Sequence, residues 1–387
     1  MDAPFHHHGG RRAAKTPQGD VNSFWAKFSR RRPSKVTSIF PRLLYASLLP
    51  VHPDPRGASS ARNAAESYDI AAKECRDKVR RIREECERTN EKFTDPDFDI
   101  ESDFTFKDNC LFGLQPPRVN HHHHHRRATP SPPPLPPDDM TVATLNQVEP
   151  GSVHRLDWIF RNPQFTVNGY SHTDVQQGVG SDCWWLAAIS TIAHRKDLMD
   201  RICVARDEEC GVYGFVFQRD GEWISTVVDD NLYLSSEDFR ERNPEVFDPD
   251  GSKAAKFRDI NQKGSEALFF SRCTEQNETW LPLMEKAYAK VHGDYEAIDG
   301  GYVGDGVEDM TGGVTSTIAT NKVLRKDRLW KELISSDGQF VFALNACRSG
   351  RVEADSGVTL GHAYTILRAV EVDTEDRKSS VRLVKIR

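Results

Sequence analysis

The stretch Gln177-Gly-Val-Gly-Ser-Asp-Cys-Trp-Trp-Leu-Ala-Ala188 decides how this sequence folds and which chemistry it can support. Two glycines, Gly178 and Gly180, allow a tight turn directly before an apolar run that is typical of a buried helix. Cys183 lies where this turn meets the helix, and the free backbone N–H groups of a helix start favour a negatively charged sulfur. We therefore predict that the pKa of this thiol is lowered.

A histidine that could deprotonate this thiol follows in the segment Gly361-His-Ala-Tyr364. The side-chain amide of Gln177, together with the N–H of Cys183, could donate hydrogen bonds to the oxyanion that forms when sulfur adds to a peptide carbonyl. The pattern predicts a cysteine nucleophile, Cys183, with His362 as its general base. The alternative is that Cys183 is an inert buried thiol on an apolar helix.

Charge is distributed unevenly along the 387 residues, of which 37% are hydrophobic and 28% charged. Residues 1–62 carry a net charge of +8, so the remainder carries −14 within a total of −6. An acidic body argues against nucleic-acid binding as the main function and is compatible with attracting calcium. We expect the basic segment to be a solvated arm, or else to contact an acidic lipid or protein surface.

The eight cysteines include no Cys-x-x-Cys pair and no Cys/His cluster with zinc spacing. We therefore expect free thiols in a reducing compartment and an intracellular, cytoplasmic protein. The most apolar early segment, residues 36–51, is interrupted by Pro41 and Arg42 and is too short to cross a bilayer. No transmembrane segment and no secretory leader are predicted.

Composition divides the chain into five parts. We predict a disordered basic arm (1–60), a helix-containing segment (61–115), a His/Pro-rich linker (116–141), a first lobe that contains the nucleophile (142–312) and a second, truncated lobe (313–387). In the linker, the tract His121–His125 could hold a soft divalent metal, and Pro132–Pro137 could dock a polyproline-binding domain. Both tracts also fit a spacer of low complexity.

Residues 64–93 are predicted to form a helix with one apolar stripe. The stripe recurs in steps of four and three at Tyr68, Ala72, Cys75, Val79, Ile82 and Cys86. It could contact a partner helix, or it could pack against its own chain.

Further elements are expected downstream. We predict a helix over 183–194, a hairpin of strands 214–217 and 223–228 with its turn at Asp220-Gly221, a helix over 281–291, and strands over 340–345, 363–372 and 381–386. Because helices come first and strands later, the pattern indicates an α+β fold with two unlike lobes.

The nucleophile segment resembles that of the calpain family of cysteine proteases. Similar motifs lie in family order between residues 155 and 387, at Asn162–Phe165, Val228–Asp230, Asn277–Trp280, Leu283–Lys290, His292–Ala297, Glu308–Val314 and Gly361–Tyr364. Residues 85–98 and 109–114 resemble, more faintly, the segment that precedes the protease core in fungal calpain-like proteins.

The resemblance implies a papain-like core in two lobes, a helical first lobe and an antiparallel β second lobe. Cys183 would be the nucleophile, His362 the general base and later acid, and Gln177 the oxyanion donor. Gly301 and Gly361 match positions that contact an extended substrate backbone. The implied activity is calcium-dependent, limited proteolysis of intracellular proteins.

The resemblance also implies a calcium site in the first lobe. Its ligands would be the carbonyl oxygens of Val167 and Gly169 and the carboxylates of Asp174 and Glu278, a set of hard oxygen donors that suits calcium. Without the resemblance, Asp174 would be an ordinary turn residue and Glu278 a helix cap.

Two features depart from the family pattern. Ser181 stands where the family usually has a glycine, and the sequence ends at Arg387, one residue before the expected catalytic asparagine that orients the histidine. We expect either an incomplete gene model of an active protease or a naturally truncated, inactive form. The second alternative would act as a non-catalytic interaction module.

Overall fold

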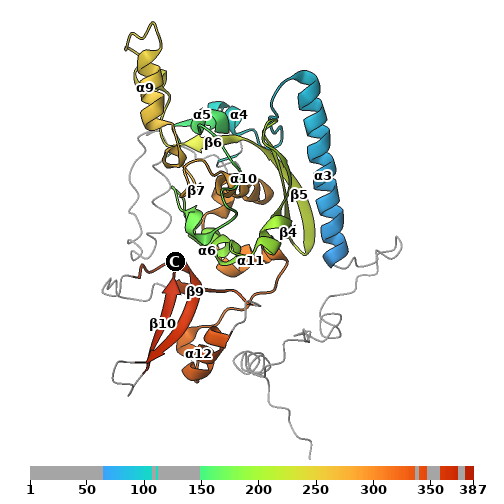
Figure 1. Cartoon of the computed structure of the whole chain (residues 1–387), viewed down its shortest axis with the longest axis vertical. Coiled ribbons are helices and arrows are strands. Elements are labelled where there is room, and N and C mark those ends of the chain that lie inside the picture. Colours follow the sequence, from blue (N-terminus) through green and yellow to red (C-terminus); the bar gives the residue numbers. More distant parts are fainter. Residues whose placement is uncertain (1–63, 107–109, 112–148, 336–339, 347–357, 374–379) are drawn as a thin grey trace, which may run out of the picture. The chain divides into compact units, whose positions relative to one another are not determined.

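The computed structural model describes residues 64–106, 110–111, 149–335, 340–346, 358–373 and 380–387 (Figure 1). The predicted basic arm and His/Pro-rich linker lie outside the described residues. Within these residues the chain forms two compact units. The larger unit draws on residues 62–315 and 343–366 with Arg387, and the smaller unit on 316–342 and 367–386. Cys183 and His362 both belong to the larger unit.

An antiparallel three-stranded sheet forms the centre of the larger unit. Its strands are β3 (Cys203–Asp207), β4 (Val212–Arg219) and β5 (Glu222–Asp229), in the order β3-β4-β5. At the turn between β4 and β5, Asp220 and Gly221 have φ angles of 53° and 86°. A tight hairpin turn of this kind needs positive φ at both positions, which Asp and Gly tolerate better than other residues. The predicted hairpin is confirmed.

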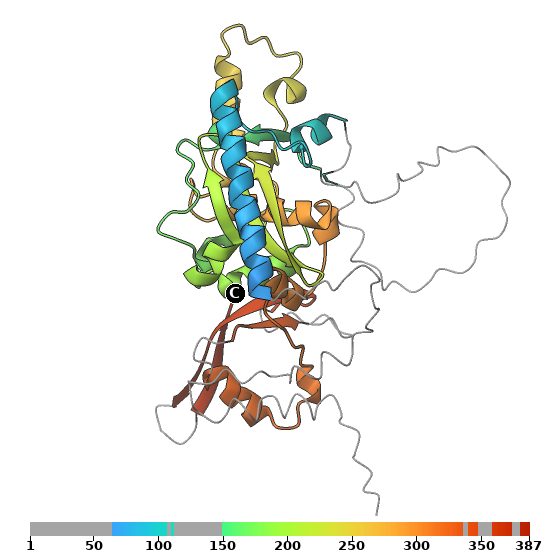
Figure 2. The same cartoon turned by 90° about the vertical axis from the view of Figure 1, so that its right-hand side faces the viewer.

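Helix α3 (Ala64–Thr89) lies along one face of this sheet (Figures 1 and 2). Its buried side chains include Cys75 and Val79, which face Gly214 of β4. A Cβ atom at Gly214 would come within 2.6 Å of the Cys75 sulfur, so the glycine lets the helix approach closely. The apolar stripe predicted for residues 64–93 is therefore covered by the chain's own sheet.

Helices α10 (Trp280–His292) and α11 (Val303–Thr311) both contact strand β4. Helix α11 also contacts α6 (Cys183–Ile192). The predicted helices around residues 183–194 and 281–291 are confirmed. Tyr288 joins these elements, because its ring stacks on Trp185 of α6 at 5.3 Å and meets Phe217 of β4 edge-on at 5.5 Å. All three rings are fully buried, so the aromatic core lies directly behind the helix that carries Cys183.

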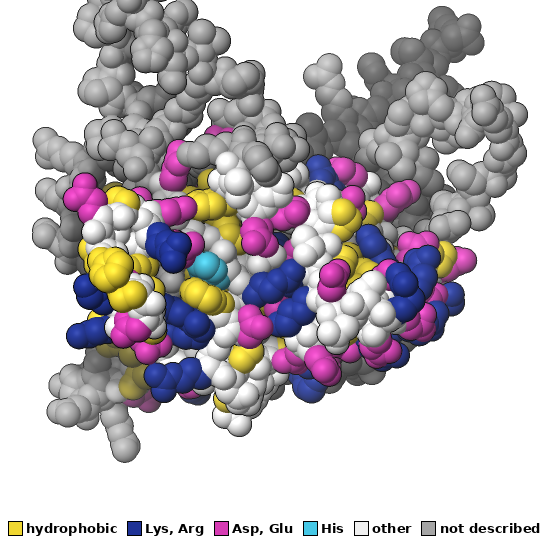
Figure 3. All heavy atoms as spheres, turned by 90° about the horizontal axis from the view of Figure 1, so that it is seen from above, with side chains coloured by type: hydrophobic (Ala, Val, Ile, Leu, Met, Phe, Trp, Pro, Cys, Tyr) yellow, Lys and Arg dark blue, Asp and Glu magenta, His cyan; other side chains and the backbone are white. Residues whose placement is uncertain are grey.

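Short elements complete the larger unit. Two small antiparallel ladders join β1 (Ser152–Arg155) to β6 (Asn231–Leu234) and β2 (Val175–Gln176) to β7 (Arg272–Cys273). The remaining helices are α4 (Ile100–Phe106), α5 (Leu156–Ile159), α7 (Lys196–Ile202), α8 (Phe239–Arg242) and α9 (Ser252–Asn261), with 3-10 turns at His172–Asp174, Ser265–Ala267 and Glu296–Ile298. Basic, acidic and hydrophobic side chains are interspersed on the face shown in Figure 3.

Strands β8 (Phe342–Ala346), β9 (His362–Asp373) and β10 (Ser380–Ile386) form a second three-stranded sheet in the order β10-β9-β8. Thr365 and Arg387 exchange both backbone hydrogen bonds, at 2.8 and 3.0 Å, as in an antiparallel pair. In the smaller unit, helix α12 (Lys326–Ser335) is linked to β9 by a bond from Trp330 Nε1 to Glu371. The predicted strands and the mixed α+β fold are confirmed. None of the described helices has the length and apolar character needed to span a membrane.

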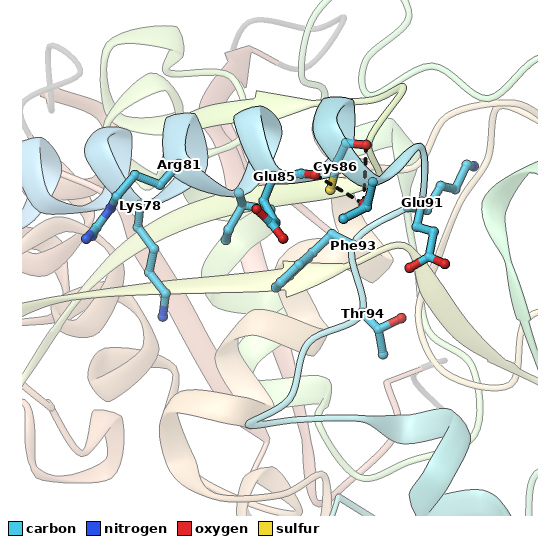
Figure 4. A pocket seen from close by; sticks show the side chains of 10 residues that line it. Lys78, Arg81, Glu85, Cys86, Glu91, Phe93 and Thr94 are labelled. Atoms are coloured by element: carbon cyan, nitrogen blue, oxygen red, sulfur yellow. Dashed lines mark hydrogen bonds between the residues drawn. The ribbon is translucent and has the colours of Figure 1, made fainter.

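A surface pocket lies at the C-terminal end of α3 and the turn that follows it (Figure 4). Lys78, Arg81, Glu85 and Glu91 mix both charges around it, and Phe93 contributes an apolar wall. Neither Cys183 nor His362 lines this pocket, so it is separate from the predicted catalytic residues.

Candidate functional site

Cys183 is the first residue of helix α6, and the turn before it is held against a neighbouring backbone. The N–H of Val179 donates to the carbonyl of Phe269 at 2.7 Å. A Cβ atom at Gly178 would lie 2.0 Å from the carbonyl oxygen of Phe270, so no other residue fits there without a shift of the backbone. The predicted turn and helix thus fix the position of the thiol.

The thiol of Cys183 is half-buried at this helix start. Burial raises its pKa above the ordinary value, although backbone hydrogen bonds from Ala363 and Trp184 act in the opposite direction. Our expectation of a lowered pKa was therefore wrong in direction, because the loss of solvation outweighs the donors at the helix start. A thiol in this environment needs a base to become a nucleophile.

His362 begins strand β9, and the residue after it contacts the nucleophile. The backbone N–H of Ala363 approaches the sulfur of Cys183 closely enough to lower the pKa of the thiol. Two residues further on, the hydroxyl of Thr365 donates to the carbonyl of Ala187 in α6 at 2.7 Å, and this contact is buried. The start of β9 is thereby attached to the nucleophile helix. The imidazole of His362 is half-buried and meets the ring of Tyr364 edge-on at 5.0 Å.

The other predicted site residues surround this contact. The amide of Gln177 is exposed and donates to the carbonyl of Gly180 at 2.8 Å, so it is engaged within its own turn. Gly301 packs against Trp184, because a Cβ atom there would come within 2.5 Å of the indole. Gly361 has a φ of 72° and open space around it. Both glycines are exposed and leave their backbones accessible.

Three of the residues proposed as calcium ligands, Val167, Gly169 and Asp174, lie along one loop, and Glu278 contacts this loop at Val167. Val167 N–H donates to Glu278 Oε1 at 2.7 Å, whereas the buried Glu278 Oε2 lacks a hydrogen-bond partner among the described residues. Burial and the negative charge of Asp174 raise the pKa of Glu278 to about 7. A buried acidic oxygen without a donor, beside a second carboxylate, fits a hard cation. The described residues contain no cluster of three or more His, Cys, Asp or Glu side chains that could hold a metal.

Arg387 links this loop to strand β9. Its guanidinium donates to the carbonyls of Thr173 and Val175, at 3.1 and 2.7 Å, on either side of Asp174. Because the backbone of Arg387 also pairs with Thr365, the loop, the β9 strand and helix α6 form one connected set of hydrogen bonds. Sequence patterns did not indicate this connection.

Sequence patterns also missed a pair of acids behind the nucleophile. Asp182, directly before Cys183, and Glu285 of α10 are both buried, and their carboxyl groups lie within interacting range of each other. Ser271 donates to Glu285 Oε2 through its N–H at 3.0 Å and its hydroxyl at 2.7 Å. The available signal was a single acidic residue, Glu285, that follows the apolar run Leu281–Met284 within a helix.

Several known proteins that are similar to this chain are calpains. The chain is 30% identical over 250 residues to calpain-A of Drosophila melanogaster, which covers 59% of this chain and 25% of that protein. It is 30% identical over 259 residues to human calpain-14, covering 63% of this chain and 33% of that protein. The bovine calpain-2 catalytic subunit is 31% identical over 233 residues, covering 58% of this chain and 29% of that protein.

These matches span a quarter to a third of the length of those relatives. A family model described as calpain family cysteine protease matches residues 135–387, which include Cys183, His362 and every other predicted site residue. The chain belongs to the calpain family of cysteine proteases.

Proposed function

We propose that the protein is a cysteine endopeptidase in which Cys183 attacks the peptide carbonyl of a protein substrate. The observation that carries this proposal is the buried hydrogen bond, 2.7 Å long, from the hydroxyl of Thr365 in β9 to the carbonyl of Ala187 in α6; near it, the backbone of Ala363 approaches the Cys183 sulfur closely enough to lower the pKa of the thiol. That contact brings the strand that begins with His362 to the nucleophile. Family membership supplies the reaction class.

In the proposed reaction, the imidazole of His362 accepts the proton of Cys183 as sulfur adds to the carbonyl carbon. The backbone N–H of Cys183 and the amide of Gln177 stabilise the oxyanion; one N–H of this amide donates to Gly180, and the second is available to donate to the oxyanion. The protonated His362 then donates its proton to the departing amine, and water hydrolyses the acyl-enzyme with His362 again as base. Because burial raises the pKa of Cys183, the step depends strongly on this base.

Gly301 and Gly361 are proposed to bind an extended substrate backbone on either side of the reacting carbonyl. Both are exposed, and neither has a side chain that would keep a peptide away. The contact of Gly301 with Trp184 places it close to the residue that follows Cys183. Close backbone approach is the usual function of glycine at such positions.

Covalent labelling tests the proposed activity. An epoxysuccinyl reagent should modify the full chain at Cys183, and Cys183→Ala should abolish the labelling. His362→Ala should slow it at least about 100-fold, as expected for loss of a general base. His194→Ala, an exposed histidine at the end of α6, is the matched control and should label at the normal rate. Labelling that is independent of His362 would contradict the mechanism and favour a non-catalytic interaction module.

Calcium is proposed to bind through the carbonyls of Val167 and Gly169 and the carboxylates of Asp174 and Glu278. Bound there, it would neutralise two carboxylates and fix the loop to which Arg387 is attached. The unsatisfied Oε2 of Glu278 supports this assignment. The same hydrogen bonds would then couple the loop to β9, the strand that carries His362.

Titration calorimetry on the full chain tests the calcium site. Glu278→Gln should weaken calcium binding about tenfold or more, because it removes one negative ligand from a buried position. Glu275→Gln is a matched control, since Glu275 is exposed and close enough to influence Asp174 without being a proposed ligand. Equal calcium affinity in both variants would remove Glu278 from the ligand set.

A further inference from the structure

Asp182 and Glu285, the pair of buried acids behind the nucleophile, lie so close together that they are expected to share a proton. Asp182 and Glu285 are 6% and 1% exposed, and their carboxyl groups lie within interacting range of each other. The buried Oδ2 of Asp182 receives no hydrogen bond from any other donor among the described residues, which leaves the carboxyl group of Glu285 as its partner. Two ionised carboxylates offer only acceptors, so a hydrogen bond between them requires a proton. Glu285 Oε2 already accepts both bonds from Ser271, which leaves its other oxygen to carry that proton.

The surroundings favour retention of the proton. The charged side chain that acts on Asp182 from outside the pair is Asp299, which adds further negative charge. Tyr295, also buried, faces both acids, and its own pKa is raised by burial and by their negative charge. On α10 the neighbouring Lys286 is bonded to Asp229. Burial raises the pKa of Asp182 and of Glu285, as expected for like charges removed from water.

The pair is also attached to the nucleophile turn. The carbonyl of Asp182 accepts the N–H groups of Trp185 and Leu186 at 2.9 and 3.0 Å, so Asp182 is the residue from which α6 begins. A negative charge on Asp182 raises the pKa of the adjacent Cys183. The position of Asp182 therefore affects the position of the Cys183 thiol, and the charge on Asp182 affects its pKa.

We propose that Glu285 is a positioning residue for the nucleophile, whose protonated carboxyl donates a hydrogen bond to Asp182 and so fixes the start of α6. The retained proton also limits the negative charge beside Cys183. This inference deepens the proposed function, because it takes Cys183 as the nucleophile. It assigns Glu285 and Ser271 a role through Asp182, without contact with substrate.

The decisive substitution is Glu285→Gln, compared with Glu285→Leu. Glutamine can donate to Asp182 through its amide and accept from Ser271 through its carbonyl, but it cannot ionise. The readout is the rate constant for alkylation of Cys183 by iodoacetamide, followed by mass spectrometry of the peptide that contains Cys183. Because this reagent needs only an accessible thiolate, the result is independent of peptidase activity.

At neutral pH, Cys183 of the Glu285→Gln variant should be alkylated at a rate within about threefold of the wild-type rate. In the Glu285→Leu variant the alkylation of Cys183 should be slower by about tenfold or more, because Asp182 then lacks its buried donor. As pH rises, the ratio of the Glu285→Gln rate to the wild-type rate should increase, because only the wild type can lose the shared proton. Glu332→Gln, a buried acid in the smaller unit, is the matched control and should follow the wild type at every pH.

Unfolding by urea gives a second measurement that remains informative if Glu285→Leu does not fold. The folded-state pKa of Glu285 is raised, so the native state retains a proton that the unfolded chain releases above its ordinary pKa. Stability should therefore fall as pH rises from that ordinary value towards the folded-state value, and Glu285→Gln should lose this dependence. Equal pH profiles for wild type and Glu285→Gln, or equal slowing in the Gln and Leu variants, would overturn the proposal.

Discussion

Replacing Lys286 with alanine should lower the free energy of unfolding by about 3–5 kcal/mol, because it leaves a buried carboxylate without its cation. The Lys286 side chain is fully buried and donates to Asp229 Oδ1 at 2.6 Å and to the carbonyl of Asn231 at 2.9 Å. Burial alone would raise the pKa of Asp229. The Lys286 ammonium and two backbone N–H groups nevertheless hold this pKa below its ordinary value. Urea unfolding at neutral pH measures the effect.

The matched control is Lys196→Ala. Lys196 also forms an ion pair with an aspartate, Asp200, but both side chains are largely exposed. Exposed pairs of this kind contribute no more than about 1 kcal/mol, so the control should unfold close to the wild type. Equal losses in the two variants would mean that burial does not determine the contribution of the Lys286 pair.

The same network extends to a part of the chain that the family match does not cover. Asp95, fully buried, accepts two hydrogen bonds from Lys290 of α10, and its N–H donates to Asp229. The family match begins at residue 135. The segment around Asp95 therefore supplies a buried counter-ion to α10, the helix that also carries Glu285. This segment and α10 belong to the same compact unit.

Local signals explain which elements could be predicted from the sequence. The Asp220-Gly221 turn requires a backbone conformation that few residue types adopt, and it lies between two runs rich in aromatic and β-branched residues. The start of α6 at Cys183 was predictable because glycines precede an uninterrupted apolar run. Such patterns are set by neighbours in the sequence and need no knowledge of tertiary contacts.

Contacts between distant residues account for what the sequence did not reveal. Asp182 and Glu285 lie 103 positions apart, and Arg387 reaches Thr173 across 214 positions. The direction of the Cys183 pKa shift was also missed, because it depends on how far the thiol is removed from solvent, a property of the folded chain. For helix α3, the apolar stripe was visible in the sequence, but its partner, the sheet at Gly214, was not.

The second large effect is expected from Gly178→Ala, in the turn before the nucleophile. The added methyl group would lie 2.0 Å from the Phe270 carbonyl oxygen and 2.5 Å from that of Phe269, both backbone atoms that cannot rotate away. The turn must therefore shift, which should cost about 3 kcal/mol of stability. Displacement of Cys183 should slow labelling by the epoxysuccinyl reagent about 100-fold, as expected for a misplacement of about 1 Å.

Gly251→Asn is the control for replacing a glycine as such. Gly251 has a φ of 71° and no atom within 4 Å of an added Cβ, and asparagine tolerates this left-handed conformation. It should leave both stability and labelling close to the wild type. The Gly178→Ala variant could lose labelling because it unfolds or because its Cys183 sulfur is displaced. Measuring folding and labelling on the same sample separates these two causes. A variant that stays folded but labels slowly would show that the turn positions the sulfur, whereas normal labelling would mean that Cys183 reacts without the geometry that Gly178 permits.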